Sequence, residues 1–150
     1  MVYPSSEDER KLAQAPHNLF IICVFLFDLL LTPAAIVIDV GMYGLLLPLS
    51  CSLAASAYIY RQGRVVTVRY IRAHWQLAFK RSLWLMAGYA VTATLILLAW
   101  LLSLTTQASM QHILWTALTR IAILPTLVAV MVTLVMEASA MSAALKGESI

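Results

Sequence analysis

The sequence predicts an all-α integral membrane protein, a bundle of four transmembrane helices with both termini in the cytoplasm. Of its 150 residues, 62% are hydrophobic and only 11% are charged, whereas soluble domains carry about 25% charged residues. The apolar residues form four long runs, and most basic residues lie between the second and third runs. A bilayer is therefore the expected solvent of this chain, and residues 1–150 are expected to form a single membrane domain.

The chain is expected to open with a polar tail, residues 1–17, of mixed charge. Ser5 or Ser6 can cap a first helical turn together with Glu9. The apolar run after this tail does not resemble a signal peptide, because an acidic-led segment precedes it and no small-residue cleavage site follows.

The first predicted span covers about residues 19–38, a length that matches a hydrocarbon core of about 30 Å. Asp28 lies near its middle. Pro33 removes a backbone donor, which predicts a kink in the helix. A tight turn with Asp39 at its outer edge should follow.

The second predicted span, about residues 42–60, must return beside the first because the turn is short. It contains many small residues, and Ser52 and Ser56 are four residues apart, a spacing that allows close helix packing. The alternative is that these serines line a polar path. Cys23 and Cys51 lack metal-ligand spacing and are expected to be packing residues.

Residues 61–81 are predicted to be the cytoplasmic loop between spans two and three. From Val65 onward their periodicity predicts an amphipathic helix in the headgroup region, running into the next span. This stretch either sets the topology as a solvated loop or binds anionic lipid or a partner's acidic face. It contains no acid, and its basic residues are Arg61, Arg64, Arg69, Arg72, Lys80 and Arg81.

The third predicted span covers about residues 82–105, where Gly88 and Thr92 form another pair of small residues. The fourth covers about residues 113–141 and is long enough that it must tilt or extend beyond the membrane. All basic residues except Arg120 fall on one side of a four-span arrangement. By the positive-inside rule, that side is the cytoplasm, and a bacterial inner membrane is the expected location.

Charged residues inside the spans are costly and mark the candidate polar sites. Asp28 and Arg120 have opposite charges at similar predicted depths, so we expect them to pair if spans one and four are neighbours. Asp39 is the competing partner of Arg120. Glu137 should lie near the cytoplasmic surface, where Arg81 or another basic residue of the 61–81 stretch can neutralise it.

No catalytic motif is evident in the chain: it lacks a Ser-His-Asp set, HExxH, GxSxG and a phosphate-binding glycine loop. His17 and His74 fall at the cytoplasmic boundary and His112 at the outer boundary, so all three are expected to be surface residues. A metal or haem shared by His17 and His74 is the weaker alternative. No cofactor, no metal and no nucleic-acid partner are predicted.

These features predict a small non-catalytic accessory subunit of a larger membrane complex. It would pack through its small-residue helix faces and present a basic cytoplasmic surface to anionic lipids or other subunits. The alternative class is a small oligomeric transporter or channel that uses Asp28, with Arg120, as its intramembrane polar site. A redox subunit associated with a quinone or haem is a third class.

Overall fold

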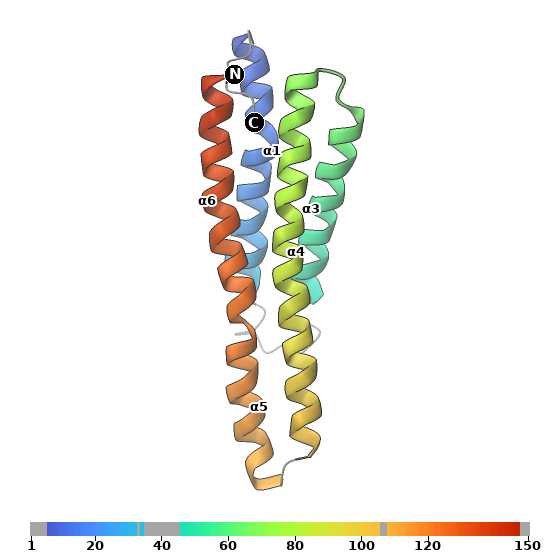
Figure 1. Cartoon of the computed structure of the whole chain (residues 1–150), viewed down its shortest axis with the longest axis vertical. Helices are drawn as coiled ribbons and strands as arrows, with labels where there is room; N and C mark the ends of the chain where they lie inside the picture. Colours follow the sequence, from blue (N-terminus) through green and yellow to red (C-terminus); the bar gives the residue numbers. More distant parts are fainter. Residues whose placement is uncertain (1–5, 33, 35–45, 106–107, 148–150) are drawn as a thin grey trace. The chain divides into compact units, whose positions relative to one another are not determined.

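The computed structural model describes residues 6–32, 34, 46–105 and 108–147, and its elements there are all helical, without a strand (Figure 1). The predicted all-α class is thereby confirmed for the described part of the chain. In order, the elements are α1 (Glu7–Cys23), the π-helix η1 (Val24–Leu31), α3 (Leu46–Val65), α4 (Arg69–Leu104), α5 (Ala108–Ala122) and α6 (Leu124–Lys146).

Three helical stretches are long and apolar enough to cross a membrane: Glu7–Leu31, Arg69–Leu104 and Met110–Lys146. Large apolar side chains such as Trp84 and Val135 are exposed on them, as expected of surfaces that face lipid. The helix that contains the described part of the second predicted span, α3, is less apolar because it continues beyond that span through Arg61, Gln62 and Arg64. Three candidate spans are therefore supported, and the fourth stays a prediction.

The described part of the predicted N-terminal tail is helical from Glu7 onward, which differs from expectation. Ser6 caps α1 through a capping box, in which its hydroxyl accepts from the Glu9 backbone and the Glu9 carboxylate accepts from the Ser6 backbone. This confirms the cap proposed from Ser6 and Glu9. The helix then continues into the first candidate span, where the backbone widens into η1. Pro33 and Asp39 lie outside the described residues.

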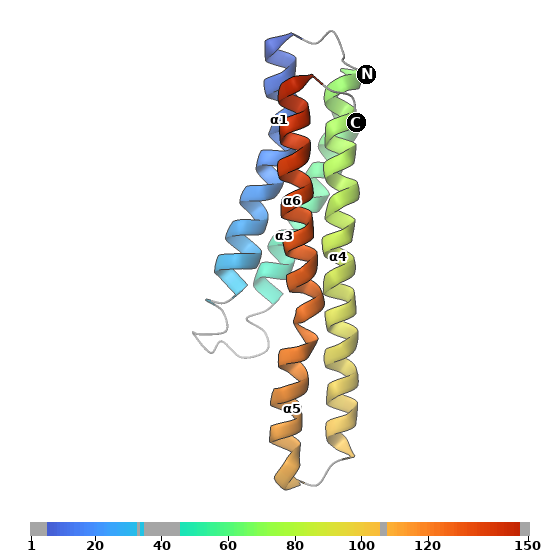
Figure 2. The same ribbon diagram turned by 60° about the vertical axis from the view of Figure 1, so that its left-hand side comes forward.

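The basic stretch 61–81 is not a separate interfacial element. Its first residues end α3, a short connection follows, and the rest forms the start of α4, which runs without interruption into the third predicted span (Figure 2). The expected apolar face exists, and its residues Ile71, Trp75 and Ala78 are buried within the protein. The amphipathic pattern therefore records packing against neighbouring helices.

The fourth predicted span is divided into two helices that meet at Ile123. Pro125 is the second residue of α6, and its missing N–H cannot bond the carbonyl of Ile121 four residues earlier. The break is thus a direct effect of the proline on the helical hydrogen-bond ladder.

The chain divides into two compact units, one formed by Met1–Ser82 with Thr133–Ile150 and the other by Leu83–Val132. In the first unit, α1 and η1 pack against α3, and the unit also contains the start of α4 and the end of α6. In the second unit, the remainder of α4 packs against the first turns of α6, where the Thr126 hydroxyl donates to the Thr92 hydroxyl over 2.8 Å.

Candidate functional site

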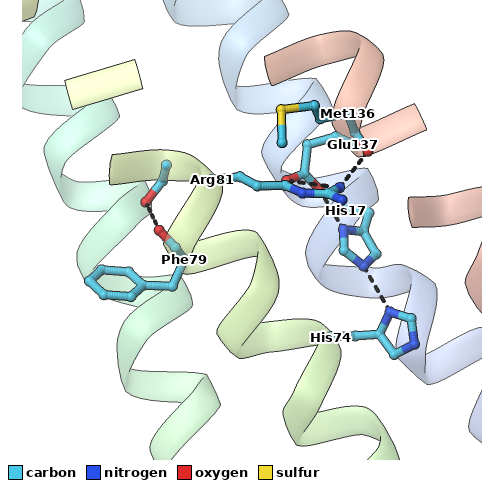
Figure 3. A network of polar contacts seen from close by, with 7 residues as sticks. His17, His74, Phe79, Arg81, Met136 and Glu137 are labelled. Atoms are coloured by element: carbon cyan, nitrogen blue, oxygen red, sulfur yellow. Dashed lines mark hydrogen bonds and ion pairs between the residues drawn. The ribbon is translucent and has the colours of Figure 1, made fainter. Parts of the chain in front are cut away.

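A buried polar cluster lies in the first unit and consists of His17, His74, Arg81 and Glu137 (Figure 3). His17 comes from α1, His74 and Arg81 from α4, and Glu137 from α6. The exposed fractions of His17, His74 and Glu137 are 0%, 1% and 0%. Three titratable side chains are thus removed from solvent at one point, which is unusual because burial of such groups is costly unless they are paired.

Helical periodicity brings these side chains together. On α1, His17 shares a buried face with Ala13 and Phe20, four residues before it and three after it. On α6, Glu137 continues a buried stripe of Thr133, Ala140 and Ala144, with the same alternating spacing of three and four. The small residues of α6 leave room for neighbouring helices, so that the long side chain of Glu137 can extend toward α1.

Hydrogen bonds connect the cluster into a chain. Glu137 Oε2 and His17 Nδ1 are in hydrogen-bonding contact. His17 Nε2 lies 3.0 Å from His74 Nδ1. At the other side of the carboxylate, Arg81 Nη1 lies 3.8 Å from Glu137 Oε1 and also donates to the carbonyl of Met136. The order of groups is therefore guanidinium, carboxylate, imidazole, imidazole.

This order fixes the proton positions of the neutral rings. With Glu137 ionised beside Arg81, the carboxylate can only accept, so His17 must carry its proton on Nδ1. A neutral His17 then accepts at Nε2, so His74 must donate from Nδ1. The Nε2 atom of His74 is left as a bare acceptor. Both histidines consequently take the same tautomer, with the proton on Nδ1.

The two ends of this hydrogen-bonded cluster hold buried polar atoms that have no hydrogen-bond partner among the described residues. They are His74 Nε2 at one end, with Glu137 Oε1 and Arg81 Nε at the other. Such atoms are rare in folded proteins and call for an explanation in terms of strain, function or a missing small partner. The ring of Tyr70 lies beside His74, with centroids 4.9 Å apart, and the Tyr70 hydroxyl donates to the Ala144 carbonyl over 3.1 Å.

A second buried acid lies at Asp28, on η1. The Ser52 hydroxyl donates to Asp28 Oδ1 over 3.2 Å, and the Ser56 hydroxyl donates to the Ser52 carbonyl over 2.9 Å. Arg120, its predicted partner, is an exposed residue of α5 in the second unit. The Asp28–Arg120 pair therefore stays a prediction, and Asp39 lies outside the described residues.

The expectation that His17 and His74 are surface residues was wrong, since both are buried, whereas His112 is exposed as expected. The error came from counting depth along the chain alone. A usable signal was present: His17 and His74 each occur in step with apolar residues of their helix, as core residues do. The expected contact between Glu137 and Arg81 is confirmed.

The small residues predicted for helix packing make contacts within the chain. A Cβ atom added to Gly88 would meet the Cβ of Ala129 at 2.5 Å, so only glycine fits there. Thr92 bonds to Thr126, and Ser52 bonds to Asp28. These faces therefore hold the chain itself together.

The basic residues of the 61–81 stretch divide into two groups. Arg72 donates to the Val66 carbonyl over 2.6 Å, and Arg81 belongs to the buried polar cluster. The others remain exposed, and we name them the basic face: Arg61, Arg64, Arg69 and Lys80. Within it, Arg64 bonds to the Tyr60 hydroxyl and lies over its ring at 5.0 Å.

Comparison with known proteins identified no relative: no family model, no curated protein and no solved structure matches this chain. Among the residues that the structure describes, no group of three or more His, Cys, Asp or Glu side chains is arranged to hold a metal ion. Function must therefore be argued from the geometry alone.

Proposed function

We propose that the protein is a small non-catalytic subunit of a larger membrane complex, with four spans and both termini in the cytoplasm of a bacterium. The observation that carries this proposal is the exposed basic face on a stretch of chain without acids. It is the kind of surface that a partner's acidic residues or anionic headgroups recognise.

The disposition of the other polar groups supports this function. Glu137 is engaged by His17 and Arg81, Asp28 by Ser52, and Arg72 by a backbone carbonyl. Contacts of this kind stabilise the fold of the chain itself. The candidate spans expose mainly apolar side chains, which suit lipid or the helices of other subunits.

The expected strength of the interaction is modest for each residue. A Lys or Arg near an anionic membrane surface contributes about 1 kcal/mol, and the contribution falls off within about 10 Å. Four exposed basic residues can therefore orient the protein and increase its association with a partner, and the association should weaken as salt rises.

The test is extraction from native membranes in a mild polymer, followed by mass determination of the intact particles and identification of the chains that copurify. A variant with Arg61, Arg64, Arg69 and Lys80 replaced by Gln should lose the copurifying subunits. Arg120→Gln is the matched control, because Arg120 is an exposed arginine outside the basic face. Recovery of the wild-type chain alone, as a monomer or homo-oligomer, would contradict the proposal.

The second candidate is a small transporter or channel, and the buried contact between Asp28 and Ser52 favours it. Ser52 and Ser56 continue a polar strip along α3 from the acid, and buried acids in membrane helices often mark ion or proton paths. Flux through proteoliposomes should then be lost in Asp28→Asn and retained in Ser50→Ala, whose hydroxyl is exposed. Equal flux in these two variants would exclude this candidate.

A further inference from the structure

We propose that the buried polar cluster is a proton relay, in which a proton received by His74 is transferred through His17 to Glu137. This inference is independent of the proposed subunit function, since it concerns the interior of the chain and not the basic face.

The hydrogen bonds of the cluster connect its groups in a way that suits proton transfer. Proton transfer along a chain requires each member to be both acceptor and donor, and a neutral imidazole is both, through its two nitrogens. In this cluster the two rings use opposite nitrogens in one line, from His74 Nδ1 to His17 Nε2 and from His17 Nδ1 to Glu137 Oε2.

The two ends of the hydrogen-bonded chain are also suited to proton transfer. His74 Nε2 is buried and lacks a hydrogen-bond partner among the described residues. It is also the atom that the tautomer argument leaves as a bare acceptor. At the far end, the ionised Glu137 carboxylate is the natural proton acceptor. The hydrogen-bonded series thus begins at an imidazole nitrogen without a hydrogen-bond partner and ends at a carboxylate.

The transfer can be written with every proton counted. A proton binds His74 Nε2, and the proton on His74 Nδ1 moves to His17 Nε2. The proton on His17 Nδ1 then moves to Glu137 Oε2, which becomes a neutral carboxylic acid. One proton enters and one is stored, both rings are neutral before and after, and both change from the Nδ1–H to the Nε2–H tautomer.

Charged and titratable groups lie beside both ends of the relay. Arg81 on α4 lies beside Glu137 on α6. Tyr70 on α4 adjoins His74, and Glu9 and Arg10 on α1 act electrostatically on Tyr70. Arg81 and His17 also act electrostatically on His74, so the same cation influences both ends of the relay.

The test uses the full chain in lipid nanodiscs, labelled with ¹⁵N in its histidines. Nitrogen chemical shifts distinguish ring nitrogens that carry a proton from those that do not. At neutral pH we expect His17 and His74 to have the proton on Nδ1. As the pH falls, the signals of Nδ1 and Nε2 should exchange places in both rings over the same pH range.

Three variants complete the experiment. Glu137→Gln removes the terminal acceptor and should abolish the joint change in both rings, while His112→Gln, at an exposed position, should leave it intact and help to assign the signals. His74→Gln should abolish the change in His17. If any variant fails to fold, the pH series of the wild-type protein is sufficient to test the relay.

The relay is overturned if both rings keep one tautomer across the pH series, which is the behaviour of a purely structural latch. It is equally overturned if the rings change independently, or if Glu137→Gln leaves the joint change as in the wild type. Loss of copurifying subunits in the basic-face variant would leave these signals unaffected, so the two proposals fail separately.

Discussion

His17 Nε2 and His74 Nδ1 lie 3.0 Å apart, although 57 residues separate the two histidines along the chain. This contact joins α1 to α4, and the contact between His17 and Glu137 joins both to α6. Three helices of the first unit therefore meet at one imidazole ring. Removal of that ring leaves the carboxylate and the second imidazole without their shared partner.

His17→Ala should destabilise the protein by about 3 kcal/mol, because it leaves the buried Glu137 Oε2 and His74 Nδ1 atoms without their hydrogen-bond partner. Unfolding in mixed detergent micelles, followed by circular dichroism, measures the change. The exposed His112→Ala is the control and should stay within about 0.5 kcal/mol of the wild type. Equal effects in the two variants would mean that the buried polar cluster does not stabilise the fold.

Gly88→Ala should destabilise the protein by about 1–3 kcal/mol, since the new methyl group would overlap the Ala129 side chain. Gly63→Ala is a matched control, because its added methyl group would meet its nearest neighbour at an ordinary 3.5 Å. That change should be neutral or stabilising by up to about 1 kcal/mol. The double variant Gly88→Ala with Ala129→Gly should recover most of the loss, and a failure to recover would argue against direct contact.

Ser52→Ala should cost about 1 kcal/mol of unfolding free energy, because it removes a buried donor to Asp28. Ser50→Ala, two residues earlier on α3, removes an exposed hydroxyl that bonds only to its own helix and should have little effect. The same unfolding assay compares the two variants. If Ser50→Ala proves as costly as Ser52→Ala, the contact with Asp28 is not the cause.

The predicted Asp28–Arg120 pair can be measured with a double-mutant cycle of Asp28→Asn and Arg120→Gln. A direct pair should give a coupling energy of about 0.5 kcal/mol or more, whereas residues without shared contacts have effects that add. Additive effects would reject the pair and leave Ser52 as the defining neighbour of Asp28.

The sequence was sufficient to predict helices, their membrane character and the cap at Ser6, since composition, run length and cap chemistry act locally. The sequence did not predict that α1 begins as early as Glu7. It also did not predict that the apolar side of the first turns of α4 is buried within the protein. A mixed-charge segment reads as a tail, yet charges are well tolerated on the exposed side of a helix. Likewise, an amphipathic face looks the same in sequence whether it is covered by lipid or by another helix, as Trp75 demonstrates.

Of the buried polar cluster, only the contact between Glu137 and Arg81 was predicted. Two opposite charges at a similar depth in the membrane predict a pair even when the packing of the helices is unknown. The participation of His17 and His74 depends on which faces of α1 and α4 turn inward, and that is decided by tertiary packing. A polar residue that keeps the spacing of the apolar residues around it is the pattern that would have indicated burial.

The π-helix η1 limits which insertions and deletions the protein can accept during evolution. Successive residues of a helix are rotated by about 100°, so the wide turns of η1 determine how the residues before it are oriented relative to those after it. Loss of a single codon between Val24 and Asp28 would therefore rotate the buried face of α1 that holds His17 by about 100° relative to Asp28. Substitutions along this segment can be tolerated singly, but its length should be far more constrained than its composition.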